Sequence, residues 1–186
     1  MNQYFIKIAL HGVSPMIWRR LRVGGHTSLA DLHHIVQITM GWDNDYLHCF
    51  HIYGEDYGIA YDGGMSFSHN ARRVFIDDFE FDVGDRFTYT YNFTIDWLCD
   101  IRIERIEQTS KKVPWCIGGS GRQGDDARYY KTDELIAMVD VIAQVAKANE
   151  TTTVGDFLPL IEYYEAVRFS RQAVNKQLME SIPRLT

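Results

Sequence analysis

Apolar and polar residues alternate over residues 87–103, and this is the clearest pattern in the chain. The apolar odd positions are Phe87, Tyr89, Tyr91, Phe93, Ile95, Trp97, Cys99, Ile101 and Ile103. A period of two is typical of a strand that buries one face and exposes the other. A single strand of this length would exceed the usual length of about 3–10 residues. We therefore predict two antiparallel strands joined by a turn near residues 92–96.

The N-terminal residues predict a hairpin. Apolar side chains occupy the even positions of residues 4–10, which indicates a first strand. Residues 12–15, with the sequence Gly-Val-Ser-Pro, supply turn chemistry. A second strand is expected over residues 16–23, and the following Gly24 and Gly25 are expected to end it.

A helix is predicted between Ser28 and Gly41. Ser28 is a favourable N-cap, and Asp31 places negative charge in the first turn, where the helix dipole favours it. Gly41 is well suited to end the helix. The apolar residues that share one face of this helix are Leu29, Leu32, Val36 and Met40.

The composition of three further segments, in the middle of the chain, predicts one strand and two loops or hairpins. We expect a strand over residues 47–53 and a loop or hairpin over the Gly- and Asp-rich residues 54–69. Residues 114–124 contain many glycines, which favours a loop.

The C-terminal third predicts helices. Thr132 is expected to cap a helix, residues 154–168 are expected to be helical in part, and Ser170 is expected to cap a last helix. The apolar faces are Leu135, Met138, Val139, Ile142 and Val145 in the first of these helices and Val174, Leu178 and Ile182 in the last. Strands gathered early and helices gathered late predict an α+β fold, with a largely antiparallel sheet packed on one face by helices.

Composition narrows the class of protein. The chain has 186 residues, of which 46% are hydrophobic, enough for a sizeable core and a single domain over residues 1–186. Its net charge of −6 disfavours nucleic-acid binding driven by bulk charge, although a local patch stays open. We expect no membrane contact, because no apolar run reaches roughly 18 residues and no leader pattern opens the chain. Cys49, Cys99 and Cys116 lack paired spacing, which indicates reduced thiols in a cytoplasmic protein.

Four histidines lie close together in the sequence and form the first candidate site. They are His33, His34, His48 and His51. Imidazole binds zinc-like metals, but no Cys-x-x-Cys pair accompanies these residues. On a strand, His48 would share a face with Phe50. One hypothesis is a metal-dependent hydrolase that uses His33 and His48 as metal ligands, with a carboxylate such as Asp43 or Asp96. The other is a structural, hydrogen-bonded role for these histidines.

A strand with three arginines forms the second candidate site. Trp18, Arg20 and Arg22 share one face of the predicted strand, and Arg19 lies between them in the sequence. An aromatic ring among arginines favours phosphate contact, so nucleic-acid binding through Arg19, Arg20 and Arg22 is one interpretation. The other is ion pairing within the molecule, because residues 43–85 contain ten acidic residues and two basic ones.

No complete catalytic constellation is evident. Residues 118–121 lack the Gly-Lys-Ser/Thr of a phosphate-binding loop, Ser120 lacks the Gly-x-Ser-x-Gly setting, and Cys99 is expected in the core. Our leading hypothesis is therefore a non-enzymatic binding module without a cofactor, whose partner is a protein or a small molecule. The surface expected to bind this partner consists of Trp18, His33, Trp42, Asp43 and His48.

Several short segments carry a resemblance to a known family. They are Trp-Arg-Arg-Leu-Arg-Val at 18–23, Ser-Leu-Ala-Asp-Leu-His at 28–33, Met-Gly-Trp at 40–42, Leu-His-Cys-Phe at 47–50, and the segments 87–97 and 174–178. In order and spacing they resemble the plasmid pRiA ORF-like family, also described as passenger proteins of an insertion element. The resemblance implies an α+β fold and a soluble bacterial or archaeal protein, and it supplies no activity or catalytic residues. The chain departs from the family pattern at Asn92, residues 94–95, Cys99 and after Cys116.

Overall fold

The computed structural model describes residues 1–14, 16–60, 65–124 and 168–181. Eight strands within these residues form one sheet in the order β5-β4-β3-β6-β7-β1-β2-β8. The strands are β1 (Asn2–Leu10), β2 (Trp18–Gly24), β3 (His48–Ile52), β4 (Glu55–Gly58), β5 (His69–Asn70), β6 (Arg86–Tyr91), β7 (Trp97–Gln108) and β8 (Trp115–Ser120). The helices are α1 (Leu29–Met40), α4 (Arg171–Ser181) and the short 3-10 helices η1 (Ala71–Arg73) and η2 (Ile76–Phe79).

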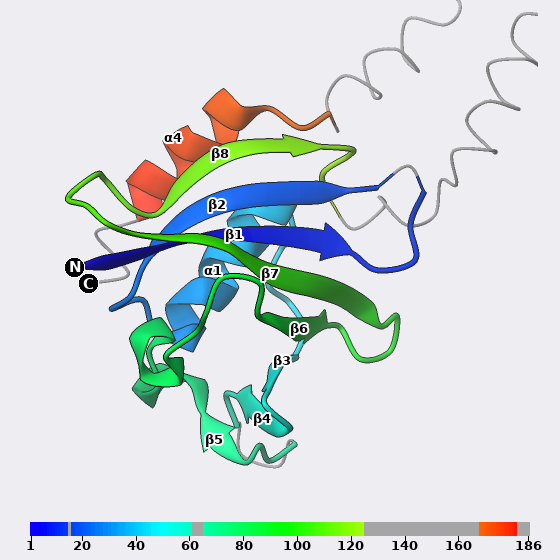
Figure 1. Ribbon diagram of the computed structural model, residues 1–186. Coiled ribbons are helices and arrows are strands. Elements are labelled where there is room, and N and C mark those ends of the chain that lie inside the picture. The colour runs from blue at the N-terminus through cyan, green and yellow to red at the C-terminus, as the bar shows by residue number, and fades with distance from the viewer. Residues whose placement is uncertain (15, 61–64, 125–167, 182–186) are drawn as a thin grey trace, which may run out of the picture.

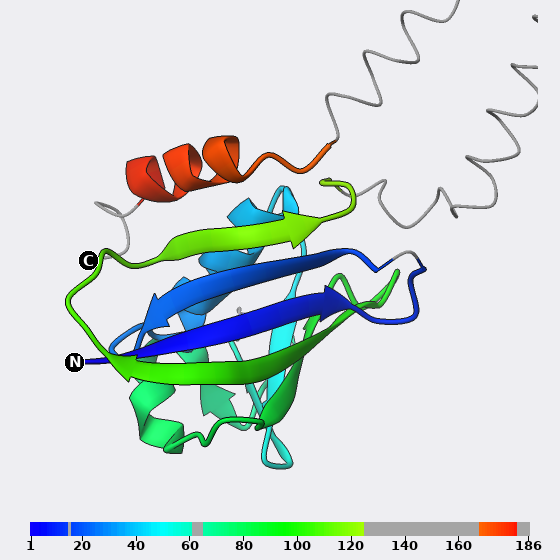
Figure 2. The same cartoon turned by 45° about the horizontal axis from the view of Figure 1, so that its top comes forward.

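The sheet is antiparallel at every described pair of neighbours except β4 with β5. This confirms a largely antiparallel sheet that shares the chain with helices. Strands β7, β1, β2 and β8 lie side by side with a common twist, and α1 lies behind β1 and β2 (Figures 1 and 2). That helices cover one face of the sheet stays a prediction.

The predicted N-terminal hairpin is confirmed. β1 pairs antiparallel with β2, from Gln3 opposite Gly24 to Ala9 opposite Trp18. The even-numbered side chains of β1 are buried, as the alternation predicts: Tyr4, Ile6, Ile8 and Leu10. Their burial fixes which face of the sheet points to the core.

The predicted helix also forms with its predicted ends. The Ser28 hydroxyl oxygen accepts a hydrogen bond from the Asp31 N–H at 3.0 Å. Gly41 adopts a left-handed conformation with φ of 76°, and its N–H donates to the Gln37 carbonyl. The predicted apolar face is buried against the core.

The long alternating segment folds into two strands, as predicted. β6 and β7 pair antiparallel across a turn in which Asn92 and Asp96 have positive φ, and the Asp96 N–H donates to the Asn92 carbonyl at 2.7 Å. The odd-numbered aromatic residues of the two strands are buried: Phe87, Tyr89, Tyr91 and Trp97. Phe93 is exposed because it lies in the turn.

The predicted strand over residues 47–53 appears as β3, which pairs antiparallel with the following β4. The start of segment 54–69, which was expected to be a loop or a hairpin, therefore belongs to a hairpin formed by β3 and β4.

Within the described residues, neither α-helix has the length and apolar character that crossing a membrane requires.

The prediction of a loop over residues 114–124 is wrong for β8, which pairs with β2. Glycine is uncommon in strand interiors, so composition favoured a loop. In this strand glycine permits a close approach, because a Cβ atom at Gly119 would lie 2.8 Å from the Trp18 carbonyl oxygen and 2.8 Å from the Phe169 ring.

The last predicted helix is confirmed as α4. The Ser170 hydroxyl oxygen accepts from the Ala173 N–H at 3.3 Å, and Val174 and Leu178 are buried. The helix predicted after Thr132 lies outside the described residues, as do Ile182 and all but the last residue of segment 154–168.

One side chain of α4 bonds to the outermost strand of the sheet. The Asn175 amide oxygen accepts from the Cys116 N–H at 2.8 Å, and its amide nitrogen donates to the Cys116 carbonyl at 2.9 Å. The amide thus bonds to both main-chain polar groups of Cys116.

Candidate functional site

The end of α1 positions the first group of predicted site residues. The Trp42 N–H bonds to the Gln37 carbonyl at 2.9 Å, so the chain turns tightly after the helix. The Trp42 ring stacks on Tyr91 with ring centroids 5.1 Å apart and is buried. Asn44 follows with a positive φ of 65°, a conformation that asparagine tolerates better than most residues.

Four residues close a ring of hydrogen bonds, which we call the polar ring: His33, Gln37, Asn44 and Tyr89. The Asn44 N–H donates to the Gln37 side-chain oxygen at 3.0 Å, and Gln37 Nε2 donates to the Tyr89 hydroxyl at 2.8 Å. The Tyr89 hydroxyl lies 2.7 Å from His33 Nδ1, and His33 Nε2 lies 2.5 Å from Asn44 Oδ1. Because Asn44 Oδ1 only accepts, His33 carries its proton on Nε2 and Tyr89 donates to Nδ1.

Burial keeps the polar ring uncharged. His33 is 2% exposed, and this burial together with the neighbouring His48 lowers the pKa of His33 to about 2. Burial likewise raises the pKa of Tyr89 well above its usual value. Both groups are therefore neutral near pH 7, and their polar atoms are engaged with each other.

His48 packs against the polar ring from β3. Its imidazole stacks on that of His33, with ring centroids 3.4 Å apart and an interplanar angle of 7°. His48 is 5% exposed, and burial lowers its pKa to about 4. Its Nε2 atom is buried and has no hydrogen-bond partner among the described residues. As the sequence predicted, His48 shares a strand face with Phe50, which is also buried.

The stacking bears on the metal hypothesis. An imidazole nitrogen directs its lone pair in the plane of its ring, so two parallel rings 3.4 Å apart do not point at one common ion. Both nitrogens of His33 are also engaged in the polar ring. Of the carboxylates considered, Asp43 accepts from the Tyr91 hydroxyl at 2.8 Å, and Asp96 lies in the β6–β7 turn. The described part of the chain has no group of three or more His, Cys, Asp or Glu placed for a metal.

The five residues of the expected binding surface do not form one surface. His33, Trp42, Asp43 and His48 meet at the end of α1, but only Asp43 is exposed. The other three are buried in one interior cluster, because His33 stacks on His48 and Trp42 stacks on Tyr89, which also contacts His33. Trp18 lies on the opposite face of the sheet, since alternation along β2 buries Arg19 on the core side.

Arg19 is an interior residue that ties three elements together. It is fully buried, and its guanidinium lies 4.4 Å from the Phe169 ring centroid. It donates to the carbonyl oxygens of Trp18, Thr39, Ser120 and Arg122. Burial lowers the pKa of Arg19 to about 10, which leaves it charged near pH 7. Because its donors are engaged with main-chain oxygens, Arg19 does not present a charge to an external phosphate.

Arg20 and Arg22 lie on the opposite face from Arg19. Arg20 forms a two-point ion pair with Glu104, at 2.5 and 3.0 Å, and its guanidinium lies 5.1 Å from the Trp18 ring centroid. Arg22 donates to the Lys112 carbonyl at 2.8 Å. Internal pairing is thus confirmed for Arg20, but its partner lies on β7 rather than in the acidic segment 43–85.

The register of the sheet extends this arginine strand into a row of cations. We call the sheet face that carries Trp18 and Arg20 the outer face. On it, Arg86 of β6 lies opposite Arg102 of β7, Arg102 lies opposite Lys7 of β1, and Lys7 lies opposite Arg20 of β2. We call these four residues the cation row. The sequence analysis did not single out Lys7, Arg86 and Arg102. Each occupies an ordinary polar position of an alternating strand, and only the register of the sheet shows that they lie opposite one another.

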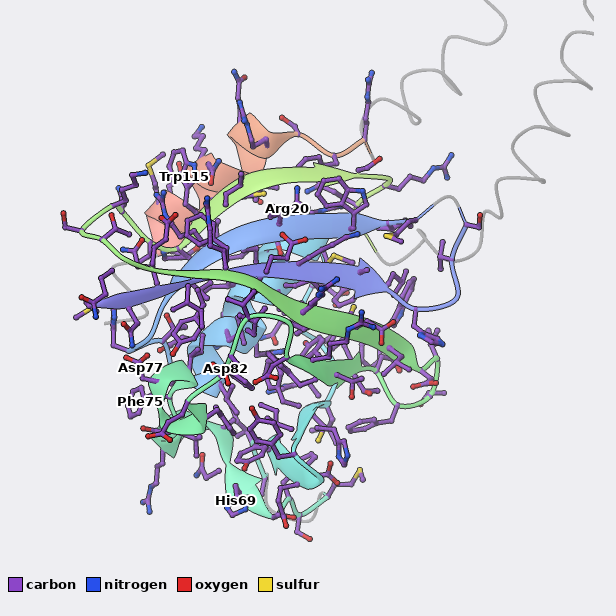
Figure 3. All side chains as sticks on the ribbon, viewed as in Figure 1. Arg20, His69, Phe75, Asp77, Asp82 and Trp115 are labelled. Carbon is purple, nitrogen blue, oxygen red and sulfur yellow. The ribbon has the colours of Figure 1, made fainter. Side chains whose placement is uncertain are left out.

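Aromatic side chains adjoin the cation row. One step along the strands, Phe5 lies opposite both Arg105 and Arg22, and Trp115 lies opposite Arg22 on β8. The Arg105 guanidinium lies 3.7 Å from the Phe5 ring centroid. Figure 3 labels Arg20 and Trp115 on the neighbouring strands β2 and β8. The carboxylates on this face are Asp100, Glu104 and Glu107, and the cations are Lys7, Arg20, Arg22, Arg86, Arg102 and Arg105.

Comparison with known proteins identifies the family. A model of the plasmid pRiA4b ORF-3-like proteins matches residues 2–139. The chain belongs to the plasmid pRiA4b ORF-3-like family. The family resemblance carried by the short motifs is thereby confirmed.

Two known proteins are similar to this chain, one in sequence and one in structure. The uncharacterized protein y4hQ of Sinorhizobium fredii (strain NBRC 101917 / NGR234) is 33% identical over 127 residues, which span 61% of this chain and 66% of that protein. A crystal structure of the protein of unknown function MM3350 from Methanosarcina mazei Go1 superimposes with a TM-score of 0.60 at 26% identity. That match covers 76% of this chain and 82% of the archaeal one.

Proposed function

We propose that this chain is a nucleic-acid-binding module without enzymatic activity, and that the outer face of the sheet is its binding surface. The observation that carries the proposal is the cation row, four basic side chains in register across four adjacent strands. We further infer that α1 and α4 cover the inner face and leave the outer face to the partner. The hydrogen bond from Arg19 to the Thr39 carbonyl and the contact of His33 with Tyr89 support this packing for α1.

The members of the cation row repel one another, and Glu104, which pairs with Arg20 and also faces Lys7 and Arg102, offsets part of this repulsion. Like charges placed directly opposite on neighbouring strands repel each other. Neighbouring strands lie about 4.8 Å apart, so the row spans roughly 14 Å. Lys7, Arg86 and Arg102 form no ion pair within 4.0 Å among the described residues. A row of phosphates would offset this repulsion, which supports a polyanionic partner.

Nucleic acid is favoured over an acidic protein because aromatic rings accompany the cations. Trp18 and Trp115 are partly exposed on the same face. Cations that bind phosphates, with aromatic rings that contact bases, are the usual composition of nucleic-acid surfaces. The net charge of −6 does not oppose this local contact, since ten of the acidic residues lie within 43–85.

Binding at graded salt tests the proposal. Fluorescence anisotropy of a short labelled oligonucleotide would be measured between about 50 and 200 mM salt. If four phosphates are contacted, log K should fall with log salt with a slope of about −3. The double variant Lys7→Gln/Arg102→Gln should bind at least about tenfold more weakly and reduce the steepness of this slope by about 1.4.

The control variant also removes two positive charges, but from a part of the chain outside the outer face. Arg72 and Arg73 are exposed on η1, outside the outer face. The variant Arg72→Gln/Arg73→Gln should therefore bind like the parent chain. Absence of binding at low salt, or equal losses in the two double variants, would rule out the cation row as the binding surface.

A further inference from the structure

We infer that the nucleic acid on the outer face is single-stranded and that one of its bases stacks on Trp18. This inference rests on the proposed function of the outer face and adds the class of ligand. The inference is based on the residues that surround the Trp18 ring, in addition to the positive charges of the cation row.

Trp18 stands among small residues. Its cross-strand neighbours are Ala9 on β1 and Ser120 on β8. The ring reaches over β8, because a Cβ atom at Gly118 would lie 3.9 Å from its outer edge. Ala9 and Ser120 have small side chains that do not cover the indole, and Trp18 itself is partly exposed.

Two members of the cation row lie over the same ring. Lys7 Nζ lies 5.5 Å and the Arg20 guanidinium 5.1 Å from the Trp18 ring centroid. The ion pair with Glu104 fixes the position of Arg20 beside the ring. A nucleotide whose base stacks on Trp18 therefore has cations within reach of its own phosphate. Base stacking beside phosphate contacts is how proteins bind single strands without reading their sequence.

The shape of the surface favours a single strand over a duplex. In a duplex the base faces are covered by neighbouring base pairs, and the major groove admits an α-helix or a two-stranded ribbon. The outer face is five strands wide, from β6 to β8, and is too broad to enter a groove. A single strand that lies across the sheet exposes base faces to Trp18 and phosphates to the cation row.

The experiment compares three ligands and two variants of the full chain. The ligands are oligothymidine, a duplex of equal length, and heparin, which is a polyanion without bases. The variants are Trp18→Leu, which removes the aromatic ring, and Trp18→Phe, which keeps one. Dissociation constants would be measured at one fixed low salt concentration, with circular dichroism as the check on folding.

We expect oligothymidine to bind more tightly than the duplex. Trp18→Leu should weaken oligothymidine binding about tenfold, Trp18→Phe should restore most of it, and heparin binding should be unchanged in both. A duplex that binds more tightly, or a Trp18→Leu variant that loses heparin and oligothymidine binding equally, would overturn the stacking inference while the cation row stands. If neither oligothymidine nor heparin binds the parent chain, the proposed function itself fails. Saturable binding of an acidic protein in their place would identify the other class of partner.

Discussion

At the scale of single residues, the polar ring binds four residues to one another, through their side chains and the main-chain N–H of Asn44. Each has one donor and one acceptor directed around the ring, and the neutral imidazole of His33 fits because it supplies one of each. Loss of any member leaves buried polar groups without partners, which costs about 1–3 kcal/mol for each group.

Tyr89→Phe tests the polar ring. The change removes the hydroxyl that donates to His33 and accepts from Gln37, with little change in packing. We expect the free energy of unfolding to fall by about 2 kcal/mol or more, measured by urea denaturation. Tyr53→Phe is the matched control, because the Tyr53 hydroxyl bonds to Asp85 at the surface and its loss should change stability by less than about 0.5 kcal/mol. Equal effects in both variants would contradict a closed ring.

The sequence predicted part of the polar ring and of the histidine stacked on it. His48 was expected on one face with Phe50, and a hydrogen-bonded structural role for the histidines was one of two hypotheses. Gln37 and Asn44 carried no signal, because an amide on a helix and an amide in a turn are common surface residues. Their partners are set by how α1 lies against β6, which no local pattern encodes.

At the scale of elements, features with a local cause were predictable and features set by register were not. The Ser28 cap, the Gly41 end and the alternation over residues 87–103 depend on neighbours in sequence, and all three are confirmed. β8 was missed because its glycines serve a close approach of Phe169 and β2, which the sequence does not display. The cation row was missed for the same kind of reason, since it joins positions on four strands.

Two substitutions on β7 should have opposite effects. Arg102→Thr removes the central repulsion of the cation row and should raise the free energy of unfolding by about 0.5 kcal/mol at low salt, and by less at high salt. Arg105→Thr should instead lower it by about 1 kcal/mol, because Arg105 covers the Phe5 ring and pairs with Glu107 at 3.2 Å. Chemical denaturation at two salt concentrations measures both. If Arg102→Thr destabilises as much as Arg105→Thr, the row carries no repulsion.

At the scale of the whole molecule, the two stacked histidines make stability depend on pH. Burial lowers the pKa of His33 to about 2 and of His48 to about 4, whereas both titrate near 6.5 in the unfolded chain. Below pH 6.5 the unfolded chain therefore binds protons that the folded chain does not, and stability falls as pH falls. Between pH 7 and pH 5 the loss should be about 2 kcal/mol for each histidine.

Urea denaturation at pH 7, 6 and 5 measures this dependence, in a window above the range where carboxylates ordinarily titrate. The variant His48→Phe keeps a stacked ring of similar size and should lose about half of the change between pH 7 and pH 5. An unchanged pH dependence in this variant would mean that the stacked pair is not its source.

The bonds from Asn175 to Cys116 have a consequence for association between chains. A terminal strand with bare peptide groups invites pairing with the same strand of another molecule, which is a common route to aggregates. On β8 the amide of α4 occupies both peptide groups of Cys116, and the Arg171 side chain donates to the next carbonyl, that of Ile117. Side chains of the C-terminal helix thus take the place of a ninth strand at Cys116 and Ile117, and they hinder the pairing of this part of β8 with a second chain.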